Sequence, residues 1–252
     1  MTYIAIHAKA ECMTLSKMMQ SKLPRELRDM VYAHLLPRKT YTTWGHLGNL
    51  WWLNSLQTTS YDHLFTHGYV PLDTMKEIGE MWYEVSTFMV PGFPSGRGSN
   101  PSGRGSNPEV ASLGLDFLLQ DTLGLDIDVH QHVKHIYIRF DYVEGVDENV
   151  TQLDANLRRL LPLGVNARVV VYLQCLHRPS STLRRQQVVA LVSKLQSIFP
   201  VLEELVEGGK RVMVNVKGYN VFDVKVERLN APTWISQLTK VLSDEDLRVL
   251  WP

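Results

Sequence analysis

Three histidines are the first residues of this sequence whose type and spacing could support chemistry. His130, His132 and His135 stand at HxHxxH spacing. Imidazole is a common zinc ligand, and Asp126 or Asp128 could supply a fourth ligand if the chain turned before the following strand. On an extended strand, however, His130 and His132 share one face and His135 points away. We favour a solvent-facing strand entry over a zinc site, and we predict no metal.

A cysteine and a histidine form the second candidate. Cys175 and His177 lie two residues apart at the end of a predicted strand, 168–176, where active sites of α/β proteins gather. A catalytic thiol needs a base within hydrogen-bond reach and a third group that orients this base. No known nucleophile, phosphate-binding or zinc-protease motif occurs in the chain. A buried structural cysteine is the better interpretation, and we predict no catalytic residue and no cofactor.

Composition and charge further narrow the possible classes of function. The chain has 252 residues, with 26 basic and 26 acidic side chains, so its formal net charge is zero. A general electrostatic attraction to nucleic acid or to an anionic membrane is therefore not expected. Only two cysteines are present, and residues 1–8 lack the basic start and the long apolar run of a secretory signal. We expect a cytoplasmic or nuclear protein.

A low-complexity segment divides the sequence. Residues 95–101 read SGRGSNP and residues 102–108 repeat them letter for letter. The segment has no apolar side chain that could join a core, so we predict a disordered loop. Its two arginines, Arg97 and Arg104, leave a nucleic-acid-binding segment as the less favoured alternative. We expect three parts: 1–94 helical and aromatic, 95–108 the loop, and 109–252 an α/β region packed on the first part.

Two helices are predicted before the loop. The first begins near Leu23-Pro24 and ends at Pro37, with leucines and valines recurring every four residues on one face. The second begins at Thr74, where Glu77 three residues later completes a capping box. Its apolar stripe is long. The stripe consists of Met75, Ile78, Trp82, Val85 and Met89.

The part after the loop alternates between strand and helix patterns. Strands are predicted at 133–140, 168–176, 211–216 and 221–226. Helices are predicted within 113–125, from Val188 to a stop at Pro200, and over 234–242, with Ser243 capping a further short turn. Residues 201–206 fit a helical turn or a strand equally. The pattern predicts a partly parallel sheet with covering helices, in an α+β (mixed α/β) chain.

The first predicted helix carries a family resemblance. Residues 23–37 read LPRELRDMVYAHLLP. They resemble the LPxELRxxIYxxLLP opening of F-box-like proteins of filamentous fungi. Glu80, Trp82, Tyr83 and Phe88 resemble that family's next helix and its short strand, and 135–140 resembles the strand that follows. The resemblance covers roughly residues 22–140.

The resemblance implies a non-enzymatic intracellular interaction module. F-box proteins dock on the small adaptor of a cullin-type ubiquitin ligase, and their C-terminal part holds the substrate. Carried over by position, the docking residues are Leu23, Pro24, Leu27, Val31 and Leu35. A substrate receptor would present the last three to solvent as an apolar patch.

Two other classes of function remain open. The chain could be a structural or orphan fungal protein whose F-box-like helix is only a core element, and then the same side chains would be buried. It could also be an enzyme that uses Cys175 with His177, or a metal at the three histidines. The sequence does not identify a partner protein or an oligomeric state.

Overall fold

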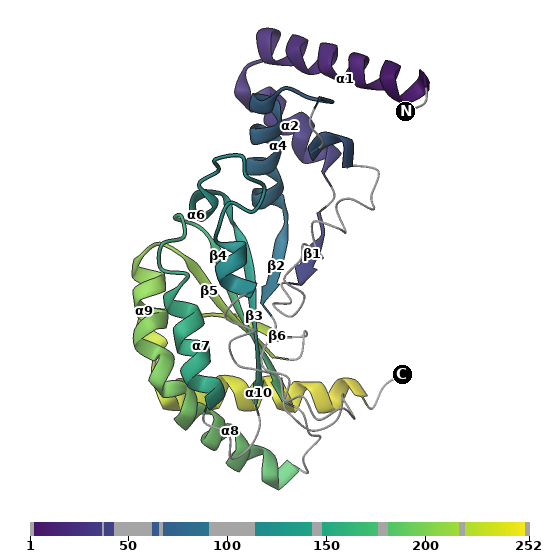
Figure 1. Cartoon of the computed structure of the whole chain (residues 1–252). Helices are drawn as coiled ribbons and strands as arrows, with labels where there is room; N and C mark the ends of the chain where they lie inside the picture. Colours follow the sequence, from purple (N-terminus) through teal and green to yellow (C-terminus); the bar gives the residue numbers. More distant parts are fainter. Residues whose placement is uncertain are drawn as a thin grey trace, which may run out of the picture.

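The structure, a computed structural model, describes residues 3–36, 38–42, 62–65, 68–90, 114–142, 148–175, 181–216 and 220–249 (Figure 1). It has the α+β fold that the sequence predicts: one six-stranded mixed sheet with helices beside it. The strands are β1 (Thr40–Thr42), β2 (Thr87–Val90), β3 (His135–Tyr142), β4 (Arg168–Cys175), β5 (Arg211–Val216) and β6 (Asn220–Asp223). The α-helices are α1 (Tyr3–Lys22), α2 (Arg25–Leu35), α4 (Leu72–Val85), α6 (Val129–His132), α7 (Glu148–Arg158), α8 (Ser181–Leu195), α9 (Phe199–Glu207) and α10 (Ala231–Val249). Short 3-10 turns are η2 (Asp62–Phe65), η3 (Gln196–Ile198) and η4 (Val226–Arg228).

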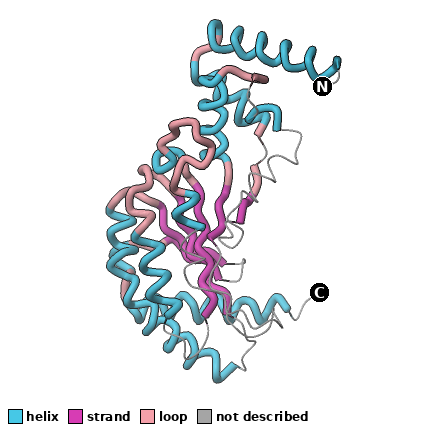
Figure 2. Tube along the Cα trace, viewed as in Figure 1, coloured by secondary structure: helices cyan, strands magenta, loops and turns pink. Residues whose placement is uncertain are grey.

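The strands lie in the sheet in the order in which they occur along the chain. β1 to β5 pair in parallel, and β6 closes the edge antiparallel to β5. Parallel neighbours need a crossover between them, and helices supply it (Figure 2). Right-handed crossovers between consecutive neighbours place their helices on the same face of the sheet.

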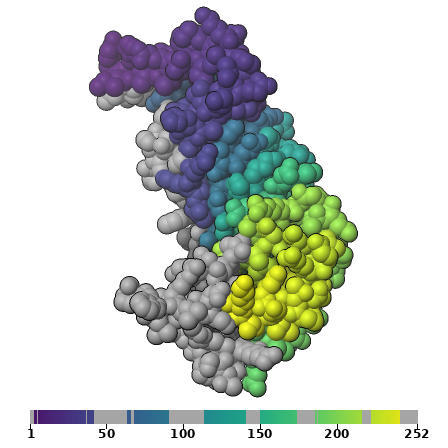
Figure 3. All heavy atoms as spheres, turned by 180° about the vertical axis from the view of Figure 1, so that it is seen from behind, coloured from purple at the N-terminus to yellow at the C-terminus, as the bar shows by residue number. Residues whose placement is uncertain are grey.

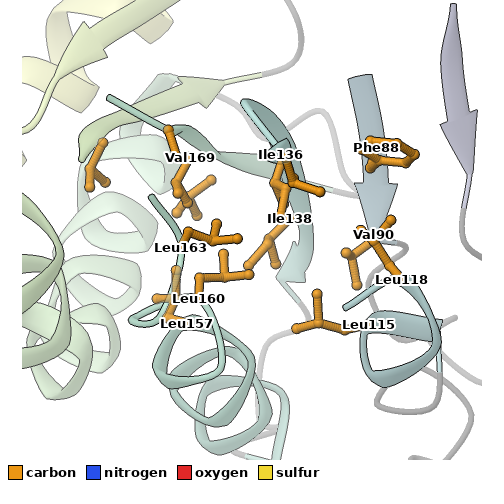
Figure 4. Packing of buried hydrophobic residues seen from close by; sticks show 14 of the residues in the cluster. Phe88, Val90, Leu115, Leu118, Ile136, Ile138, Leu157, Leu160, Leu163 and Val169 are labelled. Carbon is orange, nitrogen blue, oxygen red and sulfur yellow. The ribbon is translucent and has the colours of Figure 1, made fainter. Parts of the chain in front are cut away.

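That helical face holds the core (Figure 4). Ile136 and Ile138 of β3 point toward leucines that follow α7 and toward a helical turn at 114–118. β2 and β4 add Phe88 and Val169, both at most 1% exposed. β4 has three consecutive valines after Arg168, and all three are buried, so both faces of the strand are covered there, as its continuous apolar pattern predicts.

Two strands of the sheet come from the N-terminal part of the chain. β1 and β2 pair with each other, and β2 pairs with β3 over Thr87–Val90 and His135–Ile138. The sheet is therefore continuous across the position of the SGRGSNP repeats, which lie outside the described residues. The 1–94 part contributes strands as well as helices.

The N-terminal helices form one end of the molecule (Figure 3). Helix α1 was not predicted, because its apolar side chains are spread around the helix and form no one-sided stripe. Gln20 of α1 donates from Nε2 to Thr74 Oγ1 at 3.1 Å. This contact ties α1 to the first turn of α4.

The predicted capping box of the second helix is wrong. α4 begins at Leu72 after Pro71, two residues before Thr74, and no side chain caps it. Glu77 binds α2 instead, so it does not reach back to the helix start. The apolar stripe ends at Val85, because the chain enters β2 and carries Met89 into the sheet.

Several boundaries after the repeats also differ from the prediction. Pro200 does not end a helix: it stands in the first turn of α9, where a missing N–H costs nothing. Residues 201–206 are accordingly helical, and α10 continues through Ser243. Of the predicted helix within 113–125, the described residues 114–118 are helical, and a turn follows in which Gly124 has a positive φ. β6 ends at Asp223, earlier than predicted.

No helix in the described part of the chain is long and apolar enough to cross a membrane.

Candidate docking surface on helix α2

Helix α2 is attached to α4 through its charged side. Arg28 makes a two-pronged contact with Glu77: its Nε lies 2.9 Å from Oε2 and its Nη2 lies 2.6 Å from Oε1. Arg25 donates from Nη2 to Glu80 Oε2 at 2.8 Å and from Nε to Asp29 Oδ1 at 2.6 Å. Two arginines thus anchor α2 to its neighbour, and Arg25 also forms the i, i+4 pair that the sequence suggests.

Glu77 is the centre of this contact. Glu77 is 8% exposed, and Tyr32 of α2 also donates a hydrogen bond to its Oε2, at 3.2 Å. Burial disfavours the charged carboxylate, but the hydrogen bond from Arg28 and the charges of Arg25 and Arg28 outweigh burial and lower the pKa of Glu77. Burial and the nearby Glu77 charge raise the pKa of Tyr32 to about 12, so its hydroxyl remains a donor.

The opposite side of α2 is apolar and exposed. Leu27 is 46% exposed, Val31 37% and Leu35 44%, as the interpretation of these residues as a docking face requires. Met30 beside them is 68% exposed, Pro24 before the helix is exposed and Leu23 is half-buried. We call these side chains the α2 surface: Leu23, Pro24, Leu27, Met30, Val31 and Leu35.

Only two apolar side chains of this region turn inward. Tyr32 and Leu36 are each 3% exposed and belong to the main core. Below them, Trp82 of α4 is fully buried, and its Nε1 donates to the Tyr41 hydroxyl at 3.3 Å. Trp82 also packs edge-on against Phe88, with ring centroids 5.3 Å apart. Tyr32, Leu36 and Trp82 thus belong to the buried core, and the residues of the α2 surface do not.

Helix α1 adds further exposed apolar side chains near this end of the molecule. Tyr3, Ile4 and Ile6 near its start and Leu15 and Met18 near its end are all exposed. α1 contacts α2 directly. The N-terminal end thus presents more apolar surface than the resemblance implied.

The three histidines are separated by the fold. His130 and His132 lie on α6, a single helical turn, and His135 begins β3, so the predicted strand entry starts later than expected. His132 Nδ1 lies 3.0 Å from Glu84 Oε1, and His130 Nδ1 lies 3.8 Å from Asp128 Oδ1. Among the described residues no group of three or more His, Cys, Asp or Glu side chains is placed to hold a metal ion.

The cysteine and histidine pair is only partly described. Cys175 is the last residue of β4, as predicted, whereas His177 lies outside the described residues. The two therefore offer no geometry on which a catalytic role could be built.

The residues that anchor α2 are the part of the candidate site that sequence reasoning missed. Arg28 and Glu77 are 49 positions apart in the chain, and the contact of Glu80 with α2 spans 55. An i, i+4 rule detects pairs only within one helix. The signal that could have found them is the pair of carboxylates, at 77 and 80, on the second helix opposite the arginines at 25 and 28.

Comparisons with family models, with curated proteins and with solved structures find no match to this chain.

Proposed function

We propose that this chain is a non-enzymatic protein-interaction module that docks through the α2 surface on the small adaptor of a cullin-type ubiquitin ligase. In this role α2 and its neighbours bind the adaptor, and the sheet region holds a substrate. The chain then acts as a substrate receptor. The choice of adaptor comes from the resemblance of residues 23–37 to the F-box-like opening.

One observation carries the proposal: α2 turns its apolar side outward. A helix at the surface of a folded domain normally buries its apolar stripe and exposes its charges. In α2 the side chains of Arg25 and Arg28 face α4, and Leu27, Val31 and Leu35 face solvent. Apolar side chains held outward at adjacent turns gain free energy when a partner covers them.

The ion pairs explain how such a helix stays in place. Because the apolar face of α2 is not buried against the core, burial of that face does not hold the helix in place. Other contacts must therefore orient it. Arg28 and Glu77 are both nearly buried, and a two-pronged guanidinium–carboxylate contact fixes direction as well as distance. The α2 surface is thus pre-organised, which lowers the entropy cost of binding a partner.

The alternative, a structural or orphan protein, makes the opposite prediction for the apolar side of α2. A helix that serves only as a core element would bury Leu27, Val31 and Leu35 against the rest of the chain. Their exposure, with that of Met30, favours the docking function over this alternative.

Co-purification with the adaptor tests the proposal. The variant Leu27→Asp with Val31→Asp places two charges in the α2 surface and should abolish a stoichiometric complex. Because both side chains are exposed, the variant should keep the wild-type melting temperature and circular dichroism.

A matched control has the same chemical change at another exposed site. Val165 is 64% exposed and Val189 is 44% exposed, and neither belongs to the α2 surface. Val165→Asp with Val189→Asp should retain the complex. Failure of the wild-type chain to bind the adaptor, or equal binding by both variants, would contradict the proposal.

A further inference from the structure

The face of the sheet opposite the core carries a row of polar and basic side chains. Residues that are register partners in a parallel sheet point to the same face. The first register row of this sheet runs from β1 to β5. Its members are Thr40, Thr87, His135, Arg168 and Arg211. Since Ile136 and Val169, one position later, face the helices (Figure 4), this row faces the other side.

Two arginines and a histidine lie on this side. Arg38 lies two residues before Thr40, on the same face as the row, and is exposed. His135 and Arg168 are half-buried register partners. Burial lowers the pKa of His135, and so do the positive charges of Arg168 and Arg38, so its ring is mostly neutral at pH 7. We call the two guanidiniums, Arg38 and Arg168, with His135 on a strand between them, the cation cluster.

Arg168 has an unusual partner for a half-buried guanidinium. Its Nε donates to the thioether Sδ of Met213 at 3.0 Å, and a thioether is a weak acceptor. In the described part of the chain no carboxylate forms an ion pair with Arg168. The neighbouring arginine of the row differs, since Arg211 Nε lies 3.1 Å from Asp223 Oδ1 and Nη2 lies 3.3 Å from Oδ2.

In the described part of the chain neither guanidinium forms an ion pair with a carboxylate, and a bound anion would supply the missing counter-charge. We propose that the cation cluster binds an acidic segment of a partner protein, an extended stretch in which aspartate or glutamate side chains alternate. Carboxylates accept from the two guanidiniums, and the hydroxyls of Thr40 and Thr87 between them add donors.

The dimensions fit a peptide better than a single small anion. From β1 to β4 the cluster crosses three strand spacings, about 14 Å in all. One carboxylate contacts one or two cations at most. An extended segment of five residues covers about 13 Å from its first to its last Cα, and these two residues lie on the same face. Carboxylates at the first and last positions of such a segment reach both ends of the cluster.

This inference deepens the proposed function, because it gives the sheet region a substrate class. The test uses the full chain and no adaptor, so its failure is distinct from failure of adaptor docking. Fluorescence anisotropy measures binding of a labelled decapeptide of alternating aspartate and glycine at low salt. The matched probe has asparagine at every aspartate.

The wild-type chain should bind the aspartate peptide and not the asparagine peptide. Arg38→Gln with Arg168→Gln should weaken binding about tenfold or more, since two charge-assisted contacts are lost. Arg38→Gln alone, at an exposed position that leaves folding intact, should weaken binding about threefold. The adaptor-docking variant of Leu27 and Val31 should bind the peptide as the wild type does.

A control pair separates the site from net charge. Lys225 and Arg228 are exposed near η4, outside the cation cluster, and Lys225→Gln with Arg228→Gln removes the same charge. This control should change the dissociation constant less than twofold. Equal binding of the asparagine peptide, equal weakening by the control pair, or tighter binding of an oligothymidylate of the same charge would overturn the proposal.

Discussion

Helices α2 and α8 both carry apolar residues at helical spacing, but these residues have opposite surroundings. α8 carries Val188, Leu191, Val192 and Leu195 at helical spacing, and all four are at most 4% exposed. In α2 the apolar residues recur just as regularly, yet those at 27, 31 and 35 are exposed. α8 is held by apolar burial, whereas α2 is held largely by arginine–glutamate contacts and by Tyr32.

This difference teaches that an apolar stripe identifies the face of a helix that is suited to a contact, but not the partner that it contacts. A stripe of this kind is stabilised by burial, and the partner that buries it can be the same chain or another one. The deciding feature is the other side of the helix. Where the charged side contacts carboxylates on a neighbouring helix, as Arg28 contacts Glu77, the apolar side is left exposed.

The sharpest test of this comparison is one substitution made in both helices. Leu195→Ala in α8 should lower the free energy of unfolding by about 3 kcal/mol, because it empties a fully buried position. Leu27→Ala in α2 should lower it by about 1 kcal/mol or less, because about half of the side chain is already exposed to water. Urea unfolding of both variants measures the difference. Similar losses would mean that α2 is a core helix after all.

A second test removes the charge that anchors α2. Glu77→Gln should destabilise the chain by about 2 kcal/mol at pH 7, because Arg28 loses its charged acceptor. The exposed Glu203→Gln makes the same change in α9 and should have little effect.

The effect of Glu77 should depend on pH in a defined direction. Its pKa is lower in the folded chain than in the unfolded chain, so the stability it contributes is fully present above the unfolded value of about 4.3. That contribution is lost as the pH falls through the folded value. The difference between wild type and Glu77→Gln in thermal unfolding should therefore shrink on acidification below about pH 4.3. A difference that stays constant would contradict the role of the charge.

The smallest effect on stability is expected from shortening the SGRGSNP repeats. Deleting one of the two SGRGSNP copies, residues 102–108, shortens a segment that has no apolar side chain. Loop closure depends only weakly on length, so the free energy of unfolding should change by less than about 0.5 kcal/mol. Chemical denaturation of the shortened chain measures it. A larger loss would mean that the repeats contact the folded part.

The sequence predicted the elements whose patterns are local. Strands β3, β4 and β5 follow from β-branched and alternating residues, and α2 follows from its four-residue spacing. α1 has no one-sided stripe, so periodicity could not reveal it. Pro200 shows the limit of a local rule, since proline is compatible with the end of one helix and with the start of the next.

The residues of the candidate site were likewise predictable only in part. The residues of the α2 surface could be predicted, because their spacing and their resemblance to an F-box-like opening lie within 15 positions. Their anchors could not, because Arg28 and Glu77 meet only when α2 packs on α4. The cation cluster was equally hidden, since His135 and Arg168 become neighbours through strand register, which no local pattern contains.

The order of the strands has a consequence for synthesis on the ribosome. Each strand pairs with the one made just before it, from β1 to β6. A nascent chain that extends from its N-terminus therefore always contains the neighbour that its newest strand requires, and no strand must wait for a distant later segment. We expect the sheet to grow one strand at a time during translation, with β6 as the strand that ends its growth.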